Sequence, residues 1–243
     1  MATSSRTQDL SIRQARAERI LDSASELLLR WGYKRVTIDD IAKHAEIGKG
    51  TIYLHWKTRE ELFYAVILRE FAVVVAEDFV AAVRRDPWNA LLHRMTRAKF
   101  LAAMRRPLLR AVIVADLEVL GKLANGRGSA ASSRLDVVGT DYLKLLIEAG
   151  LIRPELSLEE LYYALGTTAG GFFLADAILG KEQPKIALER KADLLADTIR
   201  RAFEVDAATE AVRAVAPAVI ELLEHTVEIC RGVLYAPYEG RKE

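Results

Sequence analysis

The chain has few of the features on which enzymes and secreted proteins depend. Among its 243 residues there is one cysteine, Cys230, which excludes an internal disulfide and a multi-cysteine metal site. None of the four histidines stands in an H-x-x-x-H or H-E-x-x-H arrangement. Neither a G-x-S-x-G nucleophile elbow nor a phosphate-binding G-x-x-x-x-G-K occurs. We therefore expect no catalytic residue, no metal and no cofactor, and an enzyme is only the competing hypothesis.

Long apolar runs are also missing. The apolar stretch from Ala65 to Ala76 is interrupted by Arg69 and Glu70, and no segment reaches the roughly eighteen apolar residues that a transmembrane helix needs. The first ten residues, MATSSRTQDL, lack the apolar stretch of a signal peptide. These absences, together with the single cysteine, predict a soluble cytoplasmic protein that has no membrane partner.

Charge is balanced overall, with a net charge of +1, but it is unevenly distributed. Residues 1–60 hold 11 Lys and Arg against 8 Asp and Glu, whereas residues 61–243 hold 24 against 26. The basic excess in the first part predicts local contacts with phosphate, and it is too small for a protein that coats nucleic acid indiscriminately.

The sequence of residues 37–62, TIDDIAKHAEIGKGTIYLHWKTREEL, predicts a helix-turn-helix. Thr37 followed by Asp40 is a capping-box pattern that starts a helix, with Asp in place of the usual Glu. One apolar face then recurs at helical spacing through Ile38, Ile41, Ala42 and Ala45. Ile47 and Gly48 make the turn, and a second short helix begins at Lys49. Thr58 and Glu61 form another capping box, which starts a third helix.

The outer face of the second short helix has the chemistry that DNA requires. Lys49 and Thr51 can reach base edges, Gly50 lets the backbone approach the duplex, and Tyr53 and His55 can bond phosphate oxygens. We assign DNA binding to this face and its flanks, namely Thr37, Lys49, Gly50, Thr51, Tyr53, His55, Lys57 and Arg59.

This pattern resembles the DNA-binding domain of TetR/AcrR-family transcriptional regulators. The positions that match the family motif are Thr37, Ile41, Ala42, Ala45, Gly50, Thr51, Tyr53, Glu60 and Leu62. Upstream, Ile20, Ala24, Leu27 and Gly32-Tyr33 resemble the first helix of the family and its exit. Glu46 stands where the family usually has a turn glycine, which costs on the order of 1 kcal/mol if that backbone is left-handed. Gly48 replaces a serine cap, and Trp56 and Arg59 replace Phe and Lys.

The rest of the chain reads as helix, with breaks where Pro, Gly and Ser collect, so the fold class is all-α. Helices are expected over residues 59–84, 88–105, 107–121, 134–149, 157–179, 184–205 and 206–231, the last interrupted or restarted at Pro217. We expect a three-helix DNA-binding domain over residues 1–60, whose first eleven or so residues are disordered. Residues 61–243 would form a helical domain for effector binding and dimerisation.

The resemblance implies a homodimer that reads a palindromic operator and answers to a small molecule, more often as a repressor than as an activator. Gly170, Gly171 and Leu174 lie in an apolar helix where the family forms its dimer interface, although close packing within one subunit would also explain the glycines. Aromatic and methionine side chains could line a pocket for a hydrophobic or amphipathic effector, or they could be simple core: Trp88, Phe100, Met104, Tyr142, Tyr163 and Phe173. The alternative to a regulator is a helical ligand-binding or interaction protein without sequence-specific DNA binding, for which a degraded face from Lys49 to Lys57 would be expected.

Overall fold

The computed structural model describes residues 2–114, 130–179 and 185–235, and within them the fold is all-α, as predicted. The only β contact there is an isolated bridge between Ile152 and Glu204. The helices are α1 (Ala2–Trp31), α2 (Ile38–His44), α3 (Lys49–Tyr53), α4 (Arg59–Val73), α5 (Ala81–Arg85), α6 (Leu92–Arg105), α7 (Pro107–Val114), α9 (Ala130–Glu148), α10 (Leu158–Leu179), α11 (Leu188–Phe203) and α12 (Thr209–Tyr235). Residues 115–121, expected to extend α7, and residue 184, expected to start α11, lie outside the described residues.

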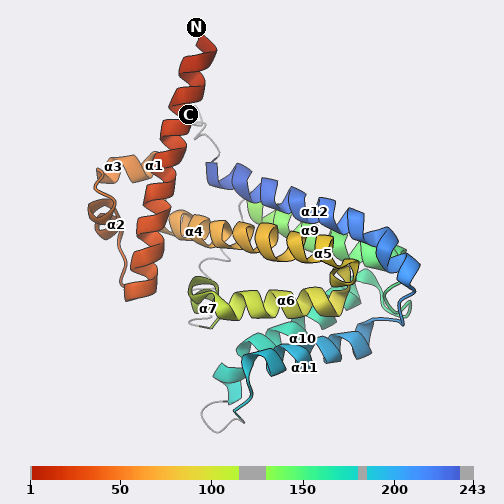
Figure 1. Cartoon of the computed structure of the whole chain (residues 1–243). Coiled ribbons are helices and arrows are strands. Elements are labelled where there is room, and N and C mark those ends of the chain that lie inside the picture. Colours follow the sequence, from red (N-terminus) through yellow and green to blue (C-terminus); the bar gives the residue numbers. More distant parts are fainter. Residues whose placement is uncertain (1, 115–129, 180–184, 236–243) are drawn as a thin grey trace.

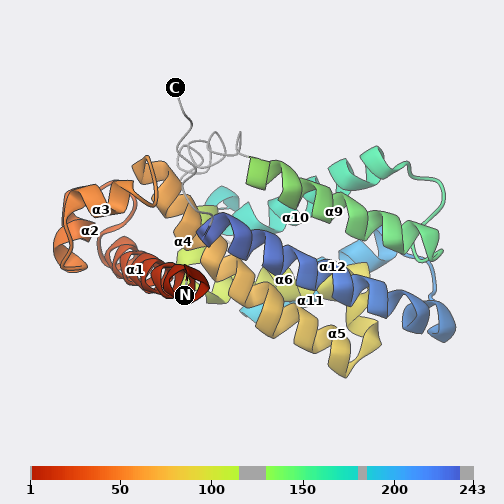
Figure 2. The same cartoon turned by 90° about the horizontal axis from the view of Figure 1, so that it is seen from above.

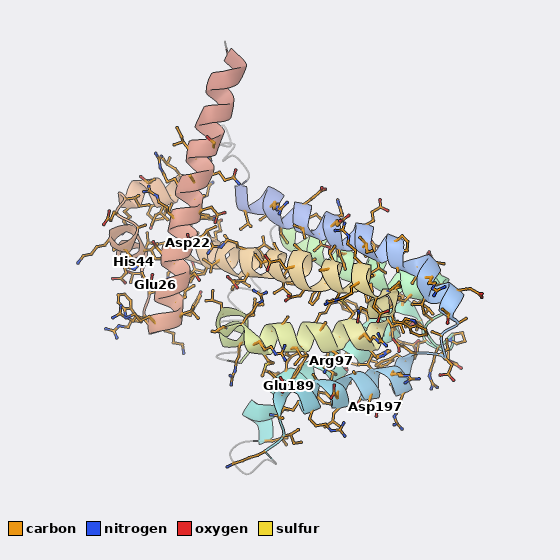
Figure 3. All side chains as sticks on the ribbon, in the orientation of Figure 1. Asp22, Glu26, His44, Arg97, Glu189 and Asp197 are labelled. Atoms are coloured by element: carbon orange, nitrogen blue, oxygen red, sulfur yellow. The ribbon has the colours of Figure 1, made fainter. Side chains whose placement is uncertain are left out.

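Helices α1, α2 and α3 form a compact head at one end of the molecule, and α4 leads from it into a bundle of the remaining helices (Figure 1). Seen from above, α4, α12 and α9 lie side by side along the bundle (Figure 2). Helices α6, α10 and α11 form the other side of it, where α6 packs against α11.

Glycines end two of the helices where the chain needs a left-handed residue. Gly32, with φ of 76°, follows α1, and Gly150, with φ of 68°, follows α9. In the second case the N–H of Leu151 bonds back to the carbonyl of Leu146 at 3.0 Å, which satisfies an otherwise free helix end. Both glycines lie where the sequence predicted the end of a helix.

The expected helix from residue 59 to residue 84 is continuous, but its middle is not α-helical. Val74–Val80 forms a π-helical segment between α4 and α5, and the helix ends before Asp86, whose backbone is extended because a proline follows. A short 3-10 turn, Pro87–Ala90, then leads into α6. The π segment contacts both α6 and α12.

Two clusters of buried apolar side chains make the core. The larger one fills the bundle from the π segment to α12. The smaller one fills the head, but it continues along α4 to Ala72 and includes Leu108 of α7 and Cys230 and Leu234 of α12. The core of the head therefore extends past residue 60 and is closed by helices from the far end of the chain.

Two parts of the fold differ from the expectations. Helix α1 begins at Ala2 where disorder was predicted, because a helix nucleated by the buried residues from Ala17 to Leu27 gains one hydrogen bond for each residue added. Helix α12 passes through Pro217 without interruption.

Candidate DNA-reading interface

The first helix of the motif starts as its sequence predicts. The backbone N–H of Asp40 donates to Thr37 Oγ1 at 3.2 Å, and the N–H of Thr37 donates to Asp40 Oδ2 at 3.0 Å. This reciprocal capping lowers the pKa of the Asp40 carboxyl, because both the hydroxyl and the N–H of Thr37 stabilise its charged form. The hydroxyl of Thr37 is therefore occupied in capping α2, although the residue is exposed at the edge of the helix-turn-helix.

The turn between α2 and α3 contains a left-handed residue at Glu46, where the family usually has a glycine. Glu46 adopts a φ of 53° and is the one described non-glycine residue with positive φ. The N–H of Ile47 bonds to the carbonyl of Ala42 at 3.0 Å, which closes the end of α2 around this residue. The turn therefore forms without the usual glycine and at the strain that a side chain brings to this conformation.

Helix α3 is anchored by two buried side chains and exposes its other face. Ile52 is fully buried and Trp56 nearly so, one turn apart against α1 and α2. Lys49, Gly50 and Tyr53 are exposed, and Thr51 is half-buried. A Cβ added at Gly50 would meet no atom within 4 Å, so this glycine is not required by packing inside the chain. The side chains assigned to base reading thus lie together on the solvent side of α3.

Lys49 is held by a partner that the sequence analysis did not identify. Its Nζ lies 2.9 Å from Oδ1 of Asp39 on α2, and the hydrogen bond to that carboxylate raises the pKa of Lys49. Asp39 is exposed in the first turn of α2, and only the fold shows that it lies against the start of α3. The ion pair spans the two helices of the motif and orients the lysine.

His55 and Arg59 differ in how they face the solvent. His55 is half-buried beside Trp56, and burial together with the positive charges of Arg13 and Arg16 lowers its pKa. Arg59 was expected near phosphate, but the structure directs its guanidinium inward. Its Nε donates to the carbonyl of Val36 at 2.8 Å, its Nη2 donates to the carbonyl of Tyr33, and the group stacks over the rings of Tyr33 and Phe63. The guanidinium is satisfied by the head itself because α4 begins against the loop that follows α1.

Lys57 is exposed at the junction before α4, close to the assigned face in sequence. The carboxylate of Glu61 accepts a hydrogen bond from the backbone N–H of Lys57 at 2.7 Å, and Thr58 Oγ1 accepts from the N–H of Glu61 at 3.1 Å. The second capping box is therefore shifted by one residue on its carboxylate side.

The residues assigned to ligand binding occupy different environments. Phe100, Met104 and Tyr142 are buried in the larger core, with the ring centroids of Phe100 and Phe173 at 5.1 Å. The hydroxyl of Tyr142 donates to the carbonyl of Ala90 at 2.9 Å, and burial raises its pKa well above the usual value. Trp88 is half-buried at the edge of this core, whereas Tyr163 on α10 is 74% exposed and belongs to neither core cluster.

A surface cleft of about 430 Å³ lies elsewhere, at the C-terminal end of α11. Charged side chains dominate its lining, including Arg153, Asp197, Arg200, Arg201 and Glu204. Next to it, Nδ1 of His93 lies 2.5 Å from Oε2 of the buried Glu204, a pair between α6 and the residue after α11 that the sequence did not reveal. None of the predicted ligand residues lines this cleft, and its charge does not suit an apolar molecule.

The candidate dimer residues lie on a helix that one subunit leaves partly uncovered. On α10 a Cβ added at Gly170 or Gly171 would meet no atom within 4 Å, so close packing inside one subunit does not account for either glycine. Leu174 is half-buried on the same helix, and Tyr162 and Leu179 are exposed. An apolar helix thus presents small residues to the solvent.

Two further findings concern the described residues alone. No helix among them is both long enough and apolar enough to cross a bilayer. Within the same ranges, no group of three or more His, Cys, Asp or Glu side chains is placed to hold a metal ion.

Comparisons with known proteins identify the helix-turn-helix. Residues 20–66 match the family model described as bacterial regulatory proteins, tetR family. The HTH-type transcriptional regulator YhgD of Bacillus subtilis is 43% identical over 82 residues, which cover 32% of this chain and 41% of that protein, less than half its length. The HTH-type transcriptional repressor Rv1474c of Mycobacterium tuberculosis is 25% identical over 195 residues, or 77% of this chain and 94% of that one.

The fold also has solved counterparts. The structure of SmeT, the repressor of the Stenotrophomonas maltophilia multidrug efflux pump SmeDEF, aligns with a TM-score of 0.54 at 19% identity and covers 78% of this chain and 91% of that one. At this identity the likeness establishes a shared fold, in which a helix-turn-helix head is followed by a helical bundle.

Proposed function

Because residues 20–66 match the family model of bacterial regulatory proteins of the tetR family, we propose that the chain is a homodimeric repressor of this family which binds a palindromic operator and is released by a hydrophobic or amphipathic small molecule. TetR-family regulators bind DNA and small-molecule effectors. We infer accordingly that the chain is a ligand-responsive DNA-binding regulator and not an enzyme. The operator symmetry, the dimer, the direction of control and the class of effector are our proposal.

The exposed face of α3 is the observation that carries this proposal. Ile52 and Trp56 fix the helix from behind, while Lys49, Thr51 and Tyr53 face the solvent from its other side. A short helix held in this way fits the major groove, where Lys49 and Thr51 would contact base edges and Tyr53, His55 and Lys57 would contact phosphates. Gly50 keeps the surface open for the DNA backbone, and Thr37 lies at the edge of the contact.

We infer a homodimer from the size of this head. One five-residue helix buries too little to read DNA alone, whereas two heads related by a two-fold axis read two half-sites about one helical turn apart or somewhat more. We place the dimer surface on α10, where Gly170, Gly171 and Leu174 would let a partner helix approach closely. We divide the functions near residue 60, with DNA binding before it and effector binding and dimerisation after it.

The effector would act inside the larger core, between helices that carry Trp88, Phe100, Met104, Tyr142 and Phe173. Tyr163 would join this site only through the dimer, since one subunit leaves it exposed. These side chains offer apolar and aromatic contact, so we expect a drug-like aromatic or a lipid-derived molecule. Binding there would move α4, which runs from the head into the bundle (Figure 1).

Selection of duplexes from a randomised pool by the full-length protein tests the proposal. We expect a palindromic sequence of roughly 15 to 30 base pairs, bound with an affinity that falls steeply with salt. Lys49→Ala and Thr51→Ala should relax the sequence preference, whereas Tyr53→Phe should weaken binding to all sequences alike. Lys144→Ala, on α9 of the bundle, is the matched control and should bind like wild type. Failure of the wild-type protein to enrich any sequence would overturn the proposed function.

A further inference from the structure

Helix α1 brings two arginines to the C-terminal end of α3. Nη2 of Arg13 lies 3.5 Å from the carbonyl oxygen of Leu54, the residue that caps α3. Arg16 follows three residues later, so it lies on the same side of α1 as Arg13. The positive charges of both act on His55, the residue after Leu54. Three basic groups from two separate elements therefore gather at one end of the reading helix.

Two acidic residues of α1 that follow these arginines are paired with another helix. Glu18 and Asp22 both bind Nη1 of Arg69 on α4, at 2.8 Å and 2.7 Å. For Arg13 and Arg16, the described part of the chain contains no carboxylate within ion-pair distance. Glu18 and Asp22 are thus directed toward α4, and Arg13 toward the end of α3.

The cluster faces open solvent on a particular side of the head. Leu54 is 61% exposed and Tyr53 is 43% exposed, so the described part of the chain leaves these side chains at the end of α3 open to solvent. The N-terminal part of α1 projects past α3 on the side opposite to α10 and α11 (Figure 1), and Figure 2 looks down the axis of α1. If two subunits meet through α10, this part of α1 lies on the outer side of each head.

We propose that Arg13, Arg16 and His55 form a phosphate-binding site which contacts the DNA backbone just outside each half-site. This inference rests on the proposed function and adds to it a contact outside the helix-turn-helix. Guanidinium groups bind phosphate through two parallel hydrogen bonds, and such contacts fix position without reading sequence. The site therefore widens the footprint of each head and makes affinity depend on flanking DNA of any sequence.

Arg13 has a second role that the test must separate from this one. Its contact with the Leu54 carbonyl caps the end of α3, so its loss could loosen the head itself. Among the described residues, Arg16 makes no hydrogen bond to α3, so a variant at Arg16 alone removes charge and leaves the cap in place. Gln suits both positions because it keeps the helix propensity of Arg.

The experiment uses the full-length protein and three duplexes. One is about 40 base pairs long and carries the selected sequence, one is a shuffled duplex of the same length and composition, and one is trimmed to the two half-sites. Fluorescence anisotropy measures Kd at several salt concentrations between about 50 and 200 mM. The proteins compared are wild type, the double variant Arg13→Gln with Arg16→Gln, the single variant Arg16→Gln, and the double variant Arg13→Lys with Arg16→Lys. The double variant Arg85→Gln with Arg213→Gln is the control. Both arginines are exposed, and replacing them removes the same amount of charge from α5 and α12, away from the proposed site.

On both long duplexes the double Gln variant should bind roughly tenfold or more weakly, with a salt slope shallower by about two per subunit. Arg16→Gln should change the slope by about one per subunit, the Lys pair should keep the wild-type slope, and the control should bind like wild type. On the trimmed duplex wild type and the double Gln variant should differ little.

Equal salt slopes for wild type and the double Gln variant on the long duplexes would overturn the proposed site. So would a loss of affinity in the control variant as large as that in the double Gln variant. If Arg16→Gln leaves the salt slope unchanged and only the variants of Arg13 lose affinity, Arg13 acts by capping α3 and phosphate binding is rejected. If wild type does not distinguish the selected from the shuffled duplex, the proposed function fails, whereas the slopes on the shuffled duplex still decide the phosphate site.

Discussion

Lys49 and Asp39 form an ion pair across the helix-turn-helix, with Nζ of the lysine 2.9 Å from Oδ1 and 3.0 Å from Oδ2 of the carboxylate. The lysine opens α3 and the aspartate lies in the first turn of α2. A carboxylate on a DNA-binding surface repels phosphate, so its presence there disfavours binding to any duplex. Its compensating effect is to hold the flexible lysine in one orientation.

Asp39→Asn should therefore raise affinity for a shuffled duplex by roughly two- to tenfold and lower the ratio of specific to non-specific affinity, because repulsion is removed and Lys49 is freed. Asp141→Asn is a matched control, since Asp141 pairs with Lys144 at 2.8 Å on α9 and that variant should leave both affinities unchanged. Anisotropy titrations with selected and shuffled duplexes measure the ratio. A ratio equal to that of wild type would show that Asp39 does not position Lys49.

Arg59 should contribute to the stability of the head more than to DNA contact. Arg59→Ala removes the bonds to the carbonyls of Val36 and Tyr33 and leaves both without this partner, at a cost of about 1 to 3 kcal/mol. The unfolding midpoint should fall by several degrees. Arg59→Lys keeps the charge but loses the planar group that bonds both carbonyls and stacks on Tyr33 and Phe63, so it should destabilise nearly as much.

Thermal unfolding and DNA titration together separate the two roles of Arg59. If Arg59→Lys has wild-type stability and Arg59→Ala loses only DNA affinity, the residue contacts phosphate and its inward position is not what matters. Arg30→Ala, at an exposed position near the end of α1, controls for loss of charge in the head.

Bulk at Gly170 should separate folding from assembly. A Cβ added there would meet no atom within 4 Å, and Gly→Leu gains roughly 1 kcal/mol of helix propensity, so the subunit should fold at least as well as wild type. A close-packed partner helix cannot absorb the added volume, so Gly170→Leu should lower dimer stability and operator affinity.

Gly232→Leu is the control for Gly170→Leu, because Gly232 lies on α12 and also has open space around it. Light scattering across a dilution series should show a dimer for wild type and Gly232→Leu and a shift toward monomer for Gly170→Leu. A wild-type protein that stays monomeric at micromolar concentration would remove the two-half-site model.

The helix-turn-helix could be predicted because its signals are local. The caps at Thr37 and Thr58 and the spacing of Ile52 and Trp56 each depend on a few neighbouring residues, and the structure has them as expected. Glu46 shows the limit of this reasoning. Its left-handed backbone follows from its place in a family turn, whereas its own side chain argues against that conformation.

Long-range contacts could not be predicted from the same signals. Arg59 follows a capping threonine like many helix-opening residues, and only the fold places Val36 and Tyr33 around its guanidinium. Cys230 and Leu234 enter the core of the head from the last helix, nearly two hundred residues from α2. Nor does any local pattern show that Arg13 meets the end of α3.

Arg106 links α6 to α4 and gives an effector a route by which it can change DNA affinity. This residue follows α6, and its Nη2 lies 3.2 Å from Asp78 in the π segment, with Nη1 3.9 Å from Glu70 on α4. One residue before Glu70, Arg69 binds Glu18 and Asp22 on α1. Movement of α6 can thus be passed to α4 and from α4 to the head.

A ligand changes DNA affinity only through its different affinities for the two arrangements, and the coupling is reciprocal. With a coupling of about 1 to 3 kcal/mol, operator DNA should weaken ligand binding by the same roughly 5- to 150-fold factor by which the ligand weakens DNA binding. Arg106→Gln should leave each separate affinity close to wild type and shrink both factors together. Arg105→Gln, which breaks only the exposed pair with Glu189 on α11, should keep the full coupling. Calorimetric titration of a small molecule that stabilises the protein, with and without operator, measures both factors. Full coupling in Arg106→Gln would show that the signal does not pass through this contact, and equal ligand affinities with and without operator in wild type would show that the molecule is not an effector.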